Sequence, residues 1–287
     1  MPWFLLAVLS AIGAAAERTF MKITKKEGVD TVVLSRFVFA LIPTLAILPF
    51  FGIPIIGPLF WPAVIVACVL DVAATTLMIK ALDHSAMSRS IPLLAFSPAF
   101  VLITGTIILG EFPTIIGIFG VLVVVLGAYV LKLKLHSGHH LEPFRRLVRE
   151  KWARYMLVAS IIMALAAPTF KTVVINSSPI FAMAVSFPIC IAYTLVFTWI
   201  RREKVHIPTE PKRLIPLVLL GLSLFSAAIL VNMAFVTGIA SYIVSIKRLS
   251  IFFNVLIGTL IFKESHAKQS IIAGLIMVLG AIIIGLS

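Results

Sequence analysis

The chain has 287 residues, of which 61% are hydrophobic and only 12% are charged, and its mean hydropathy is +1.15. These values lie far outside the range of soluble globular domains, so they exclude that class and indicate an integral membrane protein. The net charge of +13 would suggest nucleic-acid binding in a soluble protein, but here it is first a signal of membrane topology, and no nucleic-acid partner is expected.

Apolar runs of about 20 residues, the length that crosses about 30 Å of hydrocarbon, follow one another along the whole chain. They are about twice as long as a barrel strand and lack its alternating pattern, so we predict helices. The first run has no basic segment before it, so we expect it to be retained as a helix. The predicted fold is all-α with about ten transmembrane helices, at residues 2–22, 31–51, 59–81, 86–109, 114–132, 152–174, 179–200, 214–236, 239–262 and 269–286.

The basic residues fall on one side of this predicted topology. The segments after the odd-numbered spans carry them, beginning with Arg18, Lys25 and Lys26 after the first span, whereas the segments after the even-numbered spans carry none. By the positive-inside rule the odd-numbered loops are cytoplasmic, and both termini lie on the outer side of a cell (inner or plasma) membrane.

Cysteine and histidine residues give no sign of a cofactor. Cys68 and Cys190 both lie inside predicted spans, so neither a disulfide framework nor a metal-thiolate site is indicated. The stretch "HSGHH" at residues 136–140 fits no standard set of metal ligands. We therefore expect neither a metal nor a cofactor.

The two halves of the sequence match each other. Gly105-Thr106 aligns without a gap with Gly258-Thr259, and Ser97 with Ser250; Glu111 likewise aligns with Glu264 and, allowing a short gap, Lys22 with Lys171. We predict a first repeat at 1–133, a basic cytoplasmic connector at 134–151 and a second repeat at 152–287. Because five spans is an odd number, the two repeats are inverted, an architecture that places substrate near the membrane midplane.

Several of these stretches resemble a known family. "IILGE" and "LIFKE", each followed by a Gly-rich span, together with "LSRFVFALI" and "SIKRLSIFF", resemble the EamA-type carriers of the drug/metabolite transporter superfamily. The resemblance covers almost the whole chain and implies a ten-helix fold and secondary transport, commonly export or exchange. Relatives carry varied metabolites and are usually described with cytoplasmic termini, opposite to what the charge pattern predicts here.

Ionisable residues inside the spans are candidates for the functional site, because their insertion without a partner costs several kcal/mol. Lys247 and Arg248 lie roughly 12 Å into their span at 1.5 Å per residue. Lys247, Ser250 and Asn254 share one helical face, so we predict a substrate-binding site there. The remaining candidates are Lys22, Lys171 and Arg36 for substrate binding, and Asp71 and Glu17 as proton-coupling groups or counter-ions.

Several of these assignments have alternatives. Lys22, Lys171 and Arg36 are close enough to span ends to reach the interface, and Lys247 with Arg248 could hold helices together through Asp71 or Glu17. Outside the candidate set, we interpret Glu111 and Glu264 as helix caps.

The first span also resembles the first helix of the small multidrug-resistance exporters. Those proteins carry their cation-binding Glu eight residues before the equivalent Lys, where this chain has Ala14. The departure, and the excess of buried cations, favour an anionic or carboxylate-bearing substrate.

The sequence therefore predicts a secondary active transporter, exporter or exchanger, that works by alternating access and is not an enzyme. A lipid flippase of the same fold and a membrane-embedded transferase are alternatives. The expected partners are a small-molecule substrate, membrane lipids and a coupling proton or exchanged metabolite, and we expect a monomer or homodimer.

Overall fold

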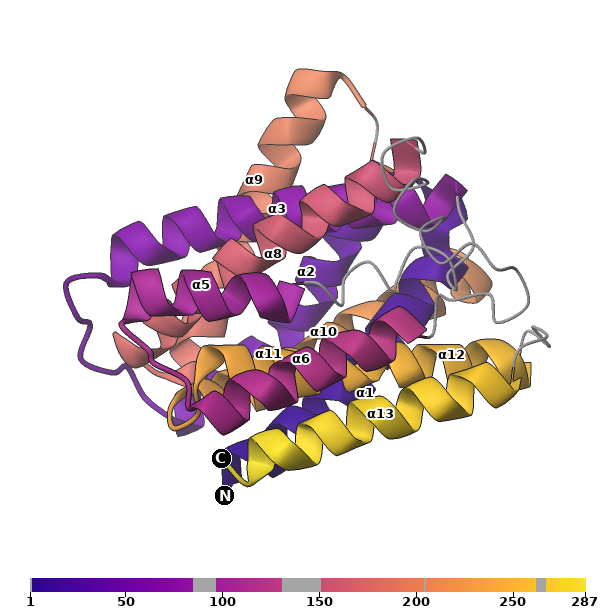
Figure 1. Ribbon diagram of the computed structural model, residues 1–287. Helices are drawn as coiled ribbons and strands as arrows, with labels where there is room; N and C mark the ends of the chain where they lie inside the picture. The colour runs from indigo at the N-terminus through magenta and orange to yellow at the C-terminus, as the bar shows by residue number, and fades with distance from the viewer. Residues whose placement is uncertain (1, 85–96, 131–150, 204, 262–266) are drawn as a thin grey trace.

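The apolar runs of the sequence form helices in the structure, a computed structural model that describes residues 2–84, 97–130, 151–203, 205–261 and 267–287 (Figure 1). Apart from two 3-10 turns, η1 (Thr24–Glu27) and η2 (Leu48–Phe50), the regular elements of these residues are α-helices, as predicted. They are α1 (Pro2–Ile23), α2 (Val29–Ile47), α3 (Phe60–His84), α5 (Ser97–Leu109), α6 (Ile115–Val130), α8 (Lys151–Ile175), α9 (Pro179–Arg201), α10 (Pro211–Phe235), α11 (Ala240–Lys247), α12 (Leu249–Ile261) and α13 (Ala267–Gly285).

Six helices of the described residues are long and apolar enough to cross a membrane: α1, α2, α3, α8, α9 and α10. Shorter apolar helices lie at Ser97–Leu109, Ile115–Ala128 and Ile272–Gly285. Part of the predicted fourth span, residues 86–96, lies outside the described residues. The helical, membrane-spanning fold is thus confirmed, whereas the number ten stays a prediction.

Local sequence signals set several helix ends. Gly28, with φ of 89°, separates η1 from α2, a backbone conformation that residues with a Cβ rarely adopt. The Ser178 hydroxyl accepts a hydrogen bond from the Phe181 amide at 3.3 Å, and Pro179 fills the first position of α9. A serine cap followed by proline is a common helix start.

The predicted single helix over 239–262 is wrong, because the helix breaks at Arg248 into α11 and α12. The Arg248 amide donates to Val244 and Ser245 carbonyls at 3.2 and 3.0 Å, and the Arg248 carbonyl accepts from Ile251 at 2.8 Å. Two of these bonds span three residues instead of four, so the backbone tightens locally to a 3-10 turn. The break lies directly after Lys247.

The packing of the helices is symmetric between the two halves. In the first half α3 lies along α8 of the second, and in return α10 of the second half lies along α1 of the first; the equivalent helices α2 and α9 pack together, as do α6 and α13 (Figure 1). Exchanging the two halves leaves this set of pairings unchanged.

The α6–α13 contact shows whether equivalent helices of the two halves run parallel or antiparallel. A Cβ added to Gly127 would lie 2.8 Å from the Met277 nitrogen, and one added to Gly280 would lie 2.7 Å from the Val124 nitrogen. Gly127 pairs with Met277 and Val124 with Gly280, so residue numbers rise along one helix as they fall along the other. The two equivalent helices are therefore antiparallel, as an inverted repeat requires.

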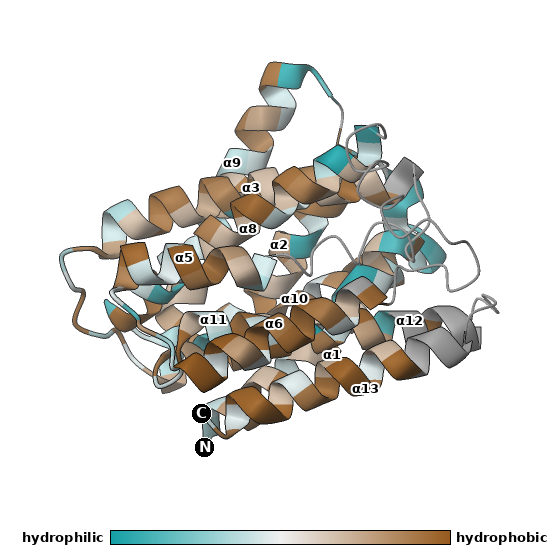
Figure 2. Cartoon of the chain, in the orientation of Figure 1, coloured by the Kyte–Doolittle hydropathy of each residue, from teal (hydrophilic) through white to brown (hydrophobic). Residues whose placement is uncertain are grey.

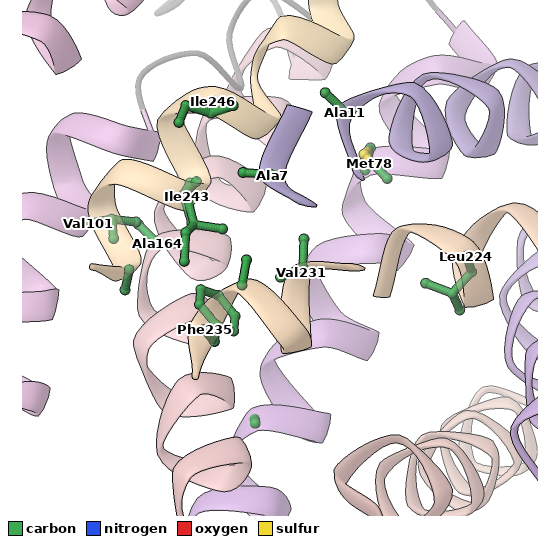
Figure 3. Close-up of a cluster of buried hydrophobic side chains, with 14 of the residues drawn as sticks. Ala7, Ala11, Met78, Val101, Ala164, Leu224, Val231, Phe235, Ile243 and Ile246 are labelled. Atoms are coloured by element: carbon green, nitrogen blue, oxygen red, sulfur yellow. The ribbon is translucent and has the colours of Figure 1, made fainter. Parts of the chain in front are cut away.

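Apolar side chains face both inward and outward. Figure 3 shows a buried cluster to which α1, α3, α5, α8, α10 and α11 contribute, with Ala7, Met78, Val101, Ala164 and Ile243 among its labelled members. Figure 2 shows that hydrophobic residues predominate along most of the helices, and large apolar side chains such as Ile115 and Ile107 are largely exposed. Many exposed apolar side chains are what contact with lipid requires.

Candidate functional site

Arg36 of α2 is held by two carboxylates in the interior of the first half. Its Nε donates to Glu17 Oε1 of α1 at 2.6 Å, and its Nη1 donates to Asp71 Oδ2 and Thr75 Oγ1 of α3, both at 3.1 Å. Arg36 and Glu17 are buried, and Asp71 is largely so. Both carboxylates are thus counter-ions of Arg36 in this structure, so they do not pair with Lys247 or Arg248.

Two further arginines form hydrogen bonds across the two halves. Arg18 Nη1 of α1 donates to Ser250 Oγ of α12, and Arg248 Nη2 at the α11–α12 break donates to Ser97 Oγ of α5. All four side chains are buried. These two arginines have hydroxyl partners rather than carboxylates, so their charges are not neutralised by the contacts they make.

Arg18 is the residue that the sequence interpretation missed. The charge pattern predicts that it lies in the basic segment after the first span, but α1 continues to Ile23 and leaves Arg18 only 4% exposed. The predicted limits of that span, 2–22, already contained it, and this was the signal that could have identified it.

Lys247 and two neighbouring groups offer hydrogen-bond donors without partners. Among the described residues, none forms a hydrogen bond or ion pair with Lys247, which is half-buried. Arg248 Nε and Asn254 Nδ2 are buried and lack a hydrogen-bond partner, while Asn254 Oδ1 lies 3.3 Å from the Thr19 hydroxyl that donates to it. Buried donors without partners are unusual and call for an explanation such as a role in binding.

Cations also outnumber carboxylates around Lys247. Lys247 lies within electrostatic range of Glu17, Arg18, Arg36 and Arg248. With Asp71, this group of described residues holds four cations and two carboxylates, and both carboxylates bind Arg36. We call Arg18, Lys247, Arg248, Ser250 and Asn254 the cation cluster; among the described residues, its three cations form no ion pair with a carboxylate.

Lys171 does not belong to this cluster. Its Nζ, at the far end of α8, donates to Glu111 Oε1 and to the Gly238 carbonyl, and it is 9% exposed. Glu111 also accepts from the Ala240 amide at 2.8 Å. Glu111 therefore caps a helix N-terminus, but that of α11 and not of the helix that follows it.

The other sequence candidates are placed as follows. Lys22 lies one turn after Arg18 on α1, is partly buried and has an interaction of its own. Cys68 and Cys190 are free and buried. In the described part of the chain no group of three or more His, Cys, Asp or Glu side chains could hold a metal, and both "HSGHH" and Glu264 lie outside it.

Apolar membrane-length helices in two symmetric halves, with a buried charge cluster between them, define a polytopic membrane protein of the two-repeat transporter class. The model of the EamA-like transporter family matches residues 1–133 and 150–286, so the chain belongs to that family. The resemblance stated from the motifs is thereby confirmed, as is the two-repeat architecture. Members of the family are transporters and generally not enzymes; the limits of the predicted repeats and connector stay a prediction.

A solved structure supports the fold. It is titled "Crystal structure of protein", is 13% identical, and superposes with a TM-score of 0.72 over 99% of this chain and 95% of its own. Identity this low shows the fold alone. No curated protein matches the chain in sequence.

Proposed function

We propose that the protein is a secondary carrier for a small anionic or carboxylate-bearing metabolite, which the cation cluster binds between the two halves. The observation that carries the proposal is a set of buried or half-buried donors that have no hydrogen-bond partner among the described residues: Arg248 Nε, Asn254 Nδ2 and Lys247 Nζ. A substrate rich in acceptor oxygens satisfies these donors, and a negative charge offsets their cost in a low-dielectric interior.

The contacts across the two halves support transport rather than simple binding. Arg18 and Ser250 come from different halves, as do Arg248 and Ser97, so a substrate at the cluster touches groups on both. Relative movement of the halves then exposes the substrate to one side of the membrane and next to the other, which is alternating access.

Arg36 has a different role in this proposal. Glu17 and Asp71 already satisfy its charge, so Arg36 anchors the carboxylates and is not a direct substrate ligand. A carboxylate released from Arg36 during the cycle is the group that could couple transport to a proton. Export or exchange is the mode we expect.

A thermal-shift screen of the purified protein tests the proposal. We would compare mono- and dicarboxylates with their neutral amides, and expect only the anions to raise the unfolding temperature by mass action. Lys247→Gln and Arg248→Gln should each lose this shift and transport of the same anion in proteoliposomes. Arg213→Gln, which breaks the exposed pair of Arg213 with Glu27, is the control and should behave as wild type.

Two results would contradict the proposal. One is equal stabilisation by neutral amides and by carboxylates. The other is full anion binding and transport in both cluster variants.

A further inference from the structure

A second polar cluster lies at the end of the molecule where both described chain ends lie (Figure 1). It consists of Glu111, Lys171, the Gly238 carbonyl and the Ala240 amide, and we call it the Glu111 cluster. Trp3, near the start of the chain, shows that the cluster lies at this end. Trp3 lies beside Gly238, and the centroid of its ring is 6.2 Å from that of Tyr242. The cluster joins the α5–α6 segment of the first half to α8 and α11 of the second.

The Glu111 cluster contacts the start of α11, the helix whose last residue, Lys247, belongs to the cation cluster. Glu111 Oε2 accepts from Ala240, the first residue of α11, and Lys247 is the last residue of the same helix. At 1.5 Å per residue, α11 is about 12 Å long. Because α11 is a rigid helix separated from α12 by the break at Arg248, its start and its end move together.

The face of α11 between the two clusters carries hydroxyl groups. Ser241 and Ser245 are buried on this helix, and Ser241 Oγ has no hydrogen-bond partner. Ser245 donates to the Ser241 carbonyl at 2.6 Å. Ser241 and Ser245 therefore place hydroxyl groups on the buried face of α11 between the Glu111 cluster and Arg248.

We propose that the Glu111 cluster is a gate that closes the route to Lys247 and Arg248 from the end where the chain ends lie. Lys171 is then a gate residue and not a substrate ligand. Breaking the contacts of Lys171 with Glu111 and with the Gly238 carbonyl frees the start of α11 from α8 and opens this end. The inference builds on the proposed carrier but concerns the conformational equilibrium, which exists without substrate.

Cysteine labelling of the substrate-free protein tests the gate. In a chain with Cys68→Ala and Cys190→Ala, Ser241→Cys reports on the gated end and Thr19→Cys, next to Asn254, reports on the region beyond Arg248. The full chain in lipid nanodiscs is treated with a membrane-impermeant maleimide. Glu111→Gln and Lys171→Gln should each raise the rate of labelling at 241 about tenfold, because this rate rises with the population of the state that is open at this end. The same variants should lower the rate of labelling at 19.

Two variants serve as controls. Lys171→Arg keeps the ion pair and should label at the wild-type rates, and Arg213→Gln breaks an exposed pair and should change neither rate. Unfolding temperatures show which variants are folded, and Glu111→Gln and Lys171→Gln test the gate independently.

Three results would overturn the gate. The first is an unchanged rate of labelling at 241 in both Gln variants. The second is faster labelling at both 241 and 19, which would indicate that the whole protein has loosened. The third is loss of anion stabilisation in Lys171→Gln but not in Glu111→Gln, which would make Lys171 a substrate ligand. Because labelling uses no substrate, failure of the proposed anion transport leaves the two labelling outcomes unaffected.

Discussion

Ser97 and Ser250 occupy equivalent positions in the two halves, and each accepts a hydrogen bond from an arginine of the opposite half. The donors, Arg248 and Arg18, are not equivalent in the repeat, so the two hydroxyls follow the repeat symmetry and the two arginines do not. A repeat-related pair of serines thus holds two unrelated cations at the boundary between the halves. This boundary is where alternating access brings substrate into contact with both halves.

The arginine between Glu17 and Asp71 is expected to be the most sensitive charged residue for stability. Arg36→Gln leaves two buried carboxylates without a cation, and removing one member of a buried ion pair costs about 3–5 kcal/mol. Thermal unfolding in detergent measures the loss. The double variant Arg36→Gln with Glu17→Gln should recover part of the lost stability, because one fewer charge is left unpaired. A loss below about 1 kcal/mol for Arg36→Gln, the value typical of exposed pairs, would contradict the structure.

The sequence predicted most helices because run length and hydropathy are local properties. It did not predict the break at Arg248, since neither proline nor glycine marks it, and the tightened backbone accompanies a contact with Ser97 some 151 residues away. Such a contact depends on how the halves pack, which periodicity does not encode.

The candidate site was predicted in part, as a set of residues rather than as a network. The repeat match singled out Ser97 and Ser250, but it could not say that Arg18 and Arg248 bind them. The sequence placed Lys171 with the substrate ligands because a buried lysine near a span end looks the same whether it binds substrate or a carboxylate. Its partner, Glu111, lies 60 residues away, and only the fold brings the two together.

The glycines between α6 and α13 provide a test of the inverted packing. Gly127→Ala and Gly280→Ala each place a Cβ within 2.8 Å of backbone atoms of the facing helix, so the helices must separate. Forcing extra volume into a packed contact costs about 1–3 kcal/mol, which thermal unfolding detects. Gly105→Ala is the matched control, a buried helical glycine whose added Cβ has 3.8 Å of clearance. Equal unfolding temperatures for all three variants would contradict this contact.

Membrane orientation is a separate prediction. The two described chain ends lie together at one end (Figure 1), and the basic segments of the sequence follow the odd-numbered spans. By the positive-inside rule we expect both termini on the outer side. Epitope tags at each terminus, detected in intact and then in permeabilised cells, measure this directly; tags seen only after permeabilisation would reverse the orientation, and the Glu111 cluster would then face the cytoplasm.

A test of Arg18 distinguishes its buried position in the structure from the basic loop position that the sequence predicted. If it lies in a basic loop, Arg18→Gln should behave like Lys26→Gln, which removes an exposed positive charge from the turn just after the same helix. If it belongs to the cation cluster, Arg18→Gln should weaken anion binding about ten- to a hundredfold, since a hydrogen bond to a charged group contributes about 1.5–3 kcal/mol. Ser250→Ala keeps the charge but removes its hydroxyl partner, so it should weaken binding less. Calorimetric titration with the anion that stabilises the wild-type protein measures all three affinities, and equal values for Arg18→Gln and Lys26→Gln would remove Arg18 from the site.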